Sequence, residues 1–240
     1  MKYVFVLMNV CAMSMPEREH TSKQYEQQLR TVKEKLLLMS HRAEMAIADA
    51  TRALVERRPS LAERVISDDD ELDRLELEVD DMCFEILARE QPVASDLRFI
   101  ATAIKIVGDI ERIGDNGVNI ARRALEIMTE PELDPIIDVP VMARAAQRIL
   151  KESLDAFVNE DVELAERAIE SDSYINDVSE QMFRELLTYM LEDPSTVSRA
   201  LRLMFVARNL ERVGDHAANI AEMVVFLVRG EDIRHGHQVS

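Results

Sequence analysis

The chain is poor in cysteine, glycine and aromatic residues. Its 240 residues include two cysteines, six glycines, no tryptophan and 5% aromatic residues. Cys11 and Cys83 form no CxxC pair, so neither a disulfide framework nor a thiolate zinc site is indicated, which fits a reducing compartment. Because free cysteine is commonly buried, we expect Cys83 to pack as a small apolar residue. The scarcity of glycine, with long three-four periodicities, favours an all-α fold.

Basic residues are in short supply, and long apolar runs are missing. The sequence has 29 Lys and Arg against 46 Asp and Glu, a formal net charge of −17. This charge argues against nucleic acid and anionic membrane surfaces as partners, because both attract basic patches. The uncharged apolar run at residues 3–13 is shorter than the roughly 20 residues of a transmembrane helix. We therefore expect a cytoplasmic protein with an unrepeated leader at residues 1–19.

What the sequence does contain is an internal repeat. Residues 111–121 read ERIGDNGVNIA and residues 211–221 read ERVGDHAANIA, with seven of the eleven positions identical at an offset of 100. Residues 61–66, LAERVI, match residues 164–169, LAERAI, at an offset of 103. A repeat of this kind decides the architecture, since each copy forms one structural unit. The sequence therefore predicts two copies of one helical unit.

Turn signals and hydrophobic periodicity divide each copy into three helices. Pro59 and Pro92 interrupt the first copy, and Ser60 with Glu63 predicts a capping box at the start of its second helix. Gly230 is well placed to end the last helix. Six helices in two tandem three-helix bundles are therefore expected. The expected segments are a leader (1–19), a first bundle (20–128), a proline-rich linker (129–140), a second bundle (141–230) and a tail (231–240).

The repeated segments place carboxylates where a helix should be apolar. In both copies apolar positions recur at alternating steps of three and four, the period of a packed helix face. Glu111 and Glu211 fall on this face, and Asp115 and Asp215 follow one turn later. A buried, ionised carboxylate needs a cation, an arginine or a raised pKa. Small neighbours such as Gly114 would let a second helix come close.

A second acidic stripe lies in the preceding helix of the first copy. Asp69, Asp73, Glu76 and Asp80 follow at spacings of four, three and four, which places them along one side of a helix. If this helix and the next are antiparallel neighbours, the two acidic stripes face each other. Such an all-oxygen site suits Mg²⁺, Ca²⁺, Mn²⁺ or iron.

Other interpretations of these residues remain open. A stripe of carboxylates on a helix is most often a solvated face. For Glu111 and Glu211 the alternative is a structural ion pair with an arginine. The arginines close in sequence are Arg112, Arg122 and Arg212. His216 follows Asp215 but is a weak ligand candidate, because its counterpart in the first copy is Asn116.

Several segments match one known family in order along the chain. They are HTSKQYEQQL (20–29), AERVISDDDELDRLE (62–76), REQPVASDLRFI (89–100), the two ERxGD segments, TYMLED (188–193) and RGEDIRHG (229–236). Together they resemble the PhoU family, the phosphate-specific transport system accessory proteins. The resemblance implies two three-helix bundles related by a pseudo-twofold axis.

The same resemblance implies a function and partners. It indicates a negative regulator of the phosphate-starvation response that limits uptake when phosphate is plentiful. The implied partners are the ATPase subunit of the phosphate ABC transporter and a sensor histidine kinase. A homodimer is also implied, and contact with a membrane only through these partners.

Finally, the resemblance implies multinuclear metal sites of iron, zinc, manganese or magnesium, held by paired E(D)xxxD motifs in each bundle. The matching positions are Asp69, Asp73, Glu111 and Asp115 in the first bundle, and Asp172, Asn176, Glu211 and Asp215 in the second. Asn176 offers only a neutral oxygen, with Asp177 as a substitute. We therefore expect the second site to be weaker or to hold fewer ions.

Enzyme signatures are missing from the sequence. No segment resembles a nucleophile–base pair, a phosphate-binding glycine loop or a hydrolytic triad, so we expect a non-enzymatic adaptor. Two alternatives come from other classes. One is a metal-dependent phosphohydrolase, which needs a general base that the sequence does not show. The other is a helical scaffold without metal, whose acidic residues pair with arginines.

Overall fold

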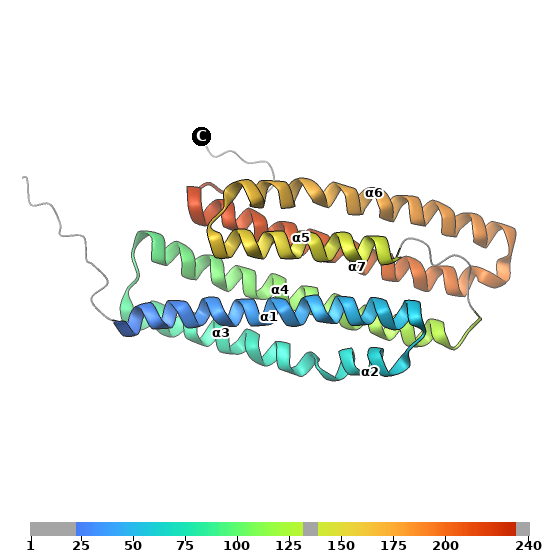
Figure 1. Cartoon of the computed structure of the whole chain (residues 1–240), viewed down its shortest axis with the longest axis horizontal. Coiled ribbons are helices and arrows are strands. Elements are labelled where there is room, and N and C mark those ends of the chain that lie inside the picture. The colour runs from blue at the N-terminus through green and yellow to red at the C-terminus, as the bar shows by residue number, and fades with distance from the viewer. Residues whose placement is uncertain (1–22, 132–138, 234–240) are drawn as a thin grey trace, which may run out of the picture.

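The computed structural model describes residues 23–131 and 139–233, and every element within these ranges is helical. The helices run nearly parallel to the long axis of the molecule (Figure 1). They are α1 (Lys23–Glu56), α2 (Pro59–Ser67), α3 (Asp69–Glu90), α4 (Ala94–Met128), α5 (Val139–Asn159), α6 (Val162–Glu192), a 3-10 turn η1 (Pro194–Thr196) and α7 (Val197–Arg229). The expected leader, 1–19, and most of the linker, 129–140, and of the tail, 231–240, lie outside the described residues.

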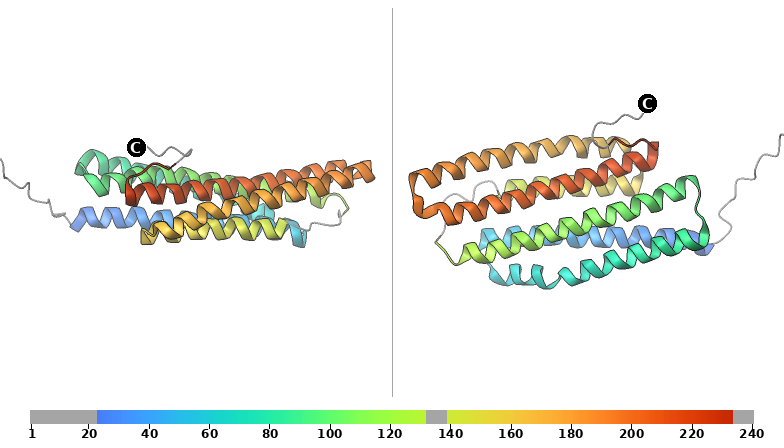
Figure 2. Two further views of the ribbon diagram at one scale, coloured as in Figure 1. Left: turned by 90° about the horizontal axis from the view of Figure 1, so that it is seen from above. Right: turned by 180° about the vertical axis from the view of Figure 1, so that it is seen from behind.

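The helices form two layers. In one layer α3, α4, α7 and α6 lie side by side in that order, and α1 and α5 cover the other side (Figure 2). The last helices of the two bundles, α4 and α7, are therefore central neighbours. The predicted all-α fold of two three-helix bundles is confirmed. None of the helices in the described residues is long and apolar enough to span a membrane.

The second predicted helix is interrupted at Asp68, so that α2 and α3 together take its place. Asp68 begins a run of four acidic residues that ends at Glu71. Acidic side chains repel one another inside a helix but are favourable in the first turn, next to the positive end of the helix dipole. The same positions in α6, Ser171 to Tyr174, contain a single acid, and α6 is continuous.

The predicted capping box at the start of the second helix is wrong. Arg58 is the N-cap residue of α2, it makes no side-chain capping hydrogen bond, and Pro59 occupies the first turn. Proline is favoured there because it lacks the N–H that would have no partner. At the other end of the chain the predicted stop is correct. Gly230 has a φ of 74°, and its N–H donates to the Phe226 carbonyl at 2.9 Å.

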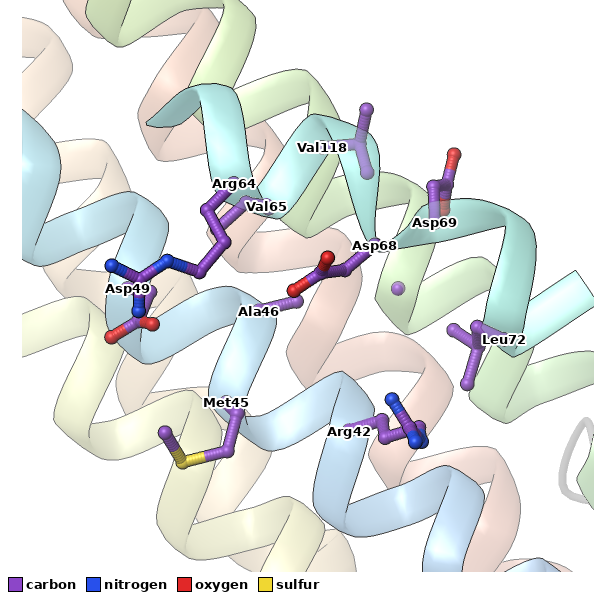
Figure 3. Close-up of a pocket in the computed structure, with 11 residues that line it drawn as sticks. Arg42, Met45, Ala46, Asp49, Arg64, Val65, Asp68, Asp69, Leu72 and Val118 are labelled. Carbon is purple, nitrogen blue, oxygen red and sulfur yellow. The ribbon is translucent and has the colours of Figure 1, made fainter. Parts of the chain in front are cut away.

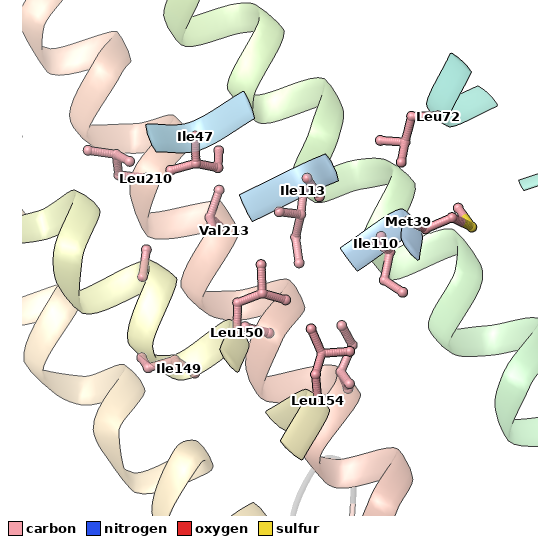
Figure 4. Close-up of a cluster of buried hydrophobic side chains, with 14 of the residues drawn as sticks. Met39, Ile47, Leu72, Ile110, Ile113, Ile149, Leu150, Leu154, Leu210 and Val213 are labelled. Carbon is pink, nitrogen blue, oxygen red and sulfur yellow. The ribbon is translucent and has the colours of Figure 1, made fainter. Parts of the chain in front are cut away.

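The two bundles share one hydrophobic core. Ile110 and Ile113 on α4 point toward Leu210 and Val213 on α7 and toward Leu150 on α5 (Figure 4). Helix α4 is consequently buried on two sides, one against its own bundle and one against the other. The pairing of α4 with α7 fixes the position of both repeated ERxGD segments relative to each other.

A glycine and a buried cysteine complete the core of the first bundle. A Cβ at Gly117 on α4 would lie 3.1 Å from the Cβ of Ala46 on α1, so glycine allows these helices to approach closely. Cys83 is fully buried, as predicted, and burial raises the pKa of its thiol to about 12. A thiol that stays protonated is a poor nucleophile and a poor metal ligand, so Cys83 acts as a packing residue.

Candidate metal centre

The first acidic cluster lies in the groove between α3 and α4. Gly114 lets the helices approach, because a Cβ there would be 2.1 Å from Cδ2 of Leu72. Burial raises the pKa of Asp69, and Asp73 and Asp115 raise it further. Burial and Asp80, followed by Asp73, also raise the pKa of Glu76. The two acidic stripes therefore face each other, as predicted, and their like charges repel.

Glu111 is the most perturbed carboxyl of this groove. Its side chain is 17% exposed, and burial, reinforced by Asp115, raises its pKa to about 7. Arg112 lies 3.4 Å from Glu111 and 3.5 Å from Asp115, and it opposes the shift without cancelling it. The ion pair with an arginine, which is the alternative to a metal at Glu111, is therefore formed in part. A guanidinium that is 64% exposed, however, does not neutralise the carboxylates of this cluster.

The second acidic cluster lies in the equivalent groove between α6 and α7. Here the glycine makes room for a carboxylate, because a Cβ at Gly214 would lie 2.6 Å from Oδ1 of Asp172. This oxygen is buried and has no hydrogen-bond partner. The other carboxylate oxygen accepts from Nδ2 of Asn176 at 3.1 Å. Burial, then Asp215, raises the pKa of Asp172, and burial with Glu211 raises that of Asp215.

Glu211, by contrast, already has partners. Its carboxylate accepts from Ser179 Oγ at 3.1 Å and pairs with Arg208. Ser179 was not expected from the sequence, although it occupies the place of Glu76 at the offset of 103. Asp177 lies on the exposed side of α6 and is not brought into the groove with Asp172. The second cluster therefore has fewer carboxylates than the first.

His216 belongs to a different groove, between α4 and α7. Its Nδ1 lies 2.9 Å from Oδ1 of Asp109, which also accepts from Nδ2 of Asn219 at 3.3 Å. This contact joins the two bundles across the open side of a cavity of about 650 Å³. His216 thus faces the first bundle. This pairing could not be predicted from the sequence, because Asp109 and His216 lie in different copies.

A smaller cavity of about 100 Å³ lies below the break between α2 and α3 (Figure 3). Asp68 and Asp69 line it from above, and Arg42 of α1 lies on its far side. Arg42 pairs with Glu71 at 2.5 Å, while its Nε is buried without a partner. Asp69 therefore borders both this cavity and the acidic groove.

The donor atoms fit a hard or borderline cation. Asp80 Oδ1 and Asp172 Oδ1 are buried without hydrogen-bond partners, and a buried unpaired oxygen is costly unless something binds it. Within residues 23–131 and 139–233, however, no three Asp, Glu, His or Cys side chains converge around one point. The carboxylates would have to rotate toward a bound ion. The eight predicted ligands therefore remain predictions, four along the groove between α3 and α4 and four along the groove between α6 and α7.

The raised pKa of Glu111 predicts a pH-dependent stability in metal-free buffer. The folded protein holds the Glu111 proton more tightly than the unfolded chain does, so the free energy of unfolding falls as the pH rises from 4.5 to about 7. Glu111→Gln removes this loss. In EDTA we expect the variant to exceed the wild type by about 1–2 kcal/mol at pH 8, after allowance for solvent screening.

Urea unfolding at pH 4 and pH 8 measures this effect, with Glu63→Gln on the exposed side of α2 as the matched control. The control should keep the pH dependence of the wild type. If Glu111→Gln kept it as well, the carboxyl of Glu111 would be ordinary and the groove would be well solvated.

Comparisons with known proteins fit this arrangement. A family model described as the PhoU domain matches residues 36–124 and 139–224. The chain is 42% identical over 217 residues to the phosphate-specific transport system accessory protein PhoU homolog of Pseudomonas aeruginosa, covering 90% of each chain. It is 33% identical over 222 residues to the accessory protein PhoU of Escherichia coli, covering 92% of each.

Solved structures show the same fold. The crystal structure of PhoU from Pseudomonas aeruginosa superposes with a TM-score of 0.84 at 41% identity, covering 86% of this chain and 100% of that one. The phosphate transport system regulatory protein PhoU from Streptococcus pneumoniae superposes with a TM-score of 0.81 at 24% identity, which supports the fold alone. The acidic grooves of both bundles lie within the matched residues, and the chain belongs to the PhoU family.

Proposed function

We propose that this chain is a non-enzymatic accessory protein of a phosphate-specific transport system and a negative regulator of the phosphate-starvation response. The observation that carries the proposal is the family match across both bundles, which includes both ERxGD segments. The relatives are named as accessory proteins of phosphate-specific transport rather than as enzymes. In this role the protein limits phosphate uptake when phosphate is plentiful.

The proposed partners follow from that role. They are the ATPase subunit of the phosphate ABC transporter and a sensor histidine kinase, with a second copy of the chain in a homodimer. The proposed location is the cytoplasm, with membrane contact only through these partners. The protein would then report phosphate supply at the transporter to the kinase by binding, not by a reaction of its own.

We further propose that the two acidic grooves hold metal. The ligands of the first site would be Asp69, Asp73, Glu111 and Asp115, and those of the second Asp172, Asn176, Glu211 and Asp215. A bound cation would offset the repulsion between the carboxylates that face each other, and it would link the two helices of each groove. Carboxylate and amide oxygens favour magnesium or manganese, and accept iron or zinc.

Two observations support this assignment. The unpartnered oxygen of Asp172 and the raised pKa of Glu111 both mark carboxylates that the protein alone does not satisfy. The second site should bind more weakly, because Asn176 is neutral and Glu211 is held by Ser179 and Arg208.

Deleting the gene tests the regulatory role. In cells grown in excess phosphate, we expect alkaline phosphatase activity to rise several-fold in the deletion strain and to return to the low level with the intact gene. Unchanged low activity would separate the chain from phosphate signalling.

A phosphatase assay on purified, metal-loaded protein tests the non-enzymatic assignment independently, because hydrolysis that is lost with the metal would identify a phosphohydrolase.

A further inference from the structure

Five large apolar side chains are exposed on α6 and α7, at the end of the molecule where the two helices meet. We call this set the α6–α7 patch. Its members are Phe183 (52% exposed), Leu187 (43%), Leu191 (78%), Leu201 (45%) and Phe205 (55%). Single exposed apolar residues are common on protein surfaces, whereas a group of large ones marks an interaction site.

One shared hollow and the helical spacing place these residues on one face. Phe183 and Arg208 line the same hollow of about 120 Å³ between α6 and α7. Leu187 and Leu191 follow Phe183 at one-turn steps along α6, and on α7 Leu201 and Phe205 precede Arg208 by about two turns and one turn. The patch therefore covers the groove between the two helices next to the second acidic cluster.

The internal repeat shows that the fold does not require this patch. At the offsets of 103 and 100, the counterparts in the first bundle are Asp80, Phe84, Ala88, Ala101 and Lys105. Four of these five are small or charged, although they occupy the same places in the same three-helix unit. The large apolar side chains were therefore not needed to build the bundle, and they are available for something outside it.

Three arginines border the patch. The guanidinium of Arg123 on α4 lies 5.4 Å from the centroid of the Phe205 ring, Arg208 lines the same hollow as Phe183, and Arg184 follows Phe183 along α6. At the offsets of 103 and 100, Arg184 and Arg208 of the second bundle correspond to Asp81 and Gly108 of the first, and Arg123 of the first corresponds to Met223 of the second. Arg184 and Arg208 are therefore also particular to the second bundle, and Arg123 adds a third positive charge from the first.

Within the described residues, each of these arginines forms its ion pair with a nearby carboxylate. The partners are Glu126, Glu180 and Glu211, three or four residues away on the same helix. Such pairs contribute only a few tenths of a kcal/mol, so they yield easily to a better carboxylate. Arginine and aromatic side chains are also the residues that contribute most to protein interfaces.

We propose that the α6–α7 patch binds an amphipathic helix of a partner protein, with an apolar face that is flanked by Asp and Glu. The apolar side chains would lie in the groove between α6 and α7, and the carboxylates would meet Arg123, Arg184 and Arg208. The chain as a whole has a net charge of −17, so the surface outside this patch repels an acidic segment and directs it to this face. The inference goes beyond the proposed function and does not depend on bound metal.

Site-specific photo-crosslinking in living cells tests the proposal. A benzophenone amino acid is placed at Leu187 or Leu201 in the full chain, expressed in its own organism, and the crosslinked peptides are identified by mass spectrometry. We expect both positions to attach to one segment of another protein that has an apolar helical face and a net negative charge. The matched control is Leu77 on α3, which is 65% exposed and should not crosslink to that segment.

A charge-reversal variant completes the test. Arg123→Glu with Arg184→Glu should lower the crosslinking yield at least severalfold, while circular dichroism shows an unchanged fold. The proposal is overturned if the attached segment is basic, if it belongs to a second copy of this chain, if the crosslinker reaches only lipid, or if no protein is attached.

Discussion

Replacing Glu111 and Asp115 together by alanine is expected to abolish metal binding at the first site and to remove the stabilisation that metal gives there. The two residues supply half of the proposed ligands, and Asp69 with Asp73 on α3 cannot enclose a cation alone. With free ion at about a hundred times its Kd, a bound ion stabilises the folded state by about 2.7 kcal/mol. Elemental analysis and thermal melting with and without EDTA measure both quantities.

Two further variants make this result specific. Glu63→Ala with Asp81→Ala removes the same charge from exposed positions of α2 and α3, and should leave metal content unchanged. Glu211→Ala with Asp215→Ala should remove only the weaker second site. Unchanged metal content and melting in the Glu111 and Asp115 double variant would refute the first site.

Phe157→Ala should lower the free energy of unfolding by about 3–5 kcal/mol, the usual cost of removing a buried aromatic ring. Phe157 is 1% exposed and is among the largest fully buried side chains. Its ring stacks on Phe99 of α4 with centroids 5.9 Å apart, so the substitution opens a cavity where α5 of one bundle meets α4 of the other. Urea unfolding followed by circular dichroism gives the value.

An exposed phenylalanine provides the matched comparison. Phe183→Ala removes the same ring from a position that is 52% exposed, and the free energy of unfolding should change by no more than about 0.5 kcal/mol. Equal losses in the two variants would contradict the burial of Phe157 between the bundles.

The sequence was sufficient to predict the repeat, the all-α fold of two three-helix bundles and the facing acidic stripes of the first bundle. It did not reveal the pairing of α4 with α7. On α4, Ile106, Ile110 and Ile113 form a second apolar stripe beside the one that carries Glu111. With apolar residues on two sides of a helix, three-four spacing does not say which side meets which neighbour. The break at Asp68 was also missed, because the apolar pattern continues through it.

For the candidate site, spacing along each helix placed the carboxylates correctly within their stripes. Contacts between helices that are far apart in the sequence could not be predicted from this spacing. The pairing of His216 with Asp109 joins residues 107 positions apart, and Ser179 reaches Glu211 only because α6 lies beside α7. Gly114 and Gly214 both admit an apolar side chain of the neighbouring helix, Leu72 and Ile175, but at Gly214 the carboxylate of Asp172 approaches as well.

The pairing of α4 with α7 has a consequence for the ancestry of the chain. A protein made of one repeat would lack α7, so the apolar stripe of α4 that packs on α7 would face water. Such a protein would have to associate with a second copy through this stripe, about a true twofold axis. Gene duplication and fusion would then turn that contact between two chains into the shared core described above. Once the halves were covalently joined, each could diverge separately, as Ser179 in the place of Glu76 illustrates.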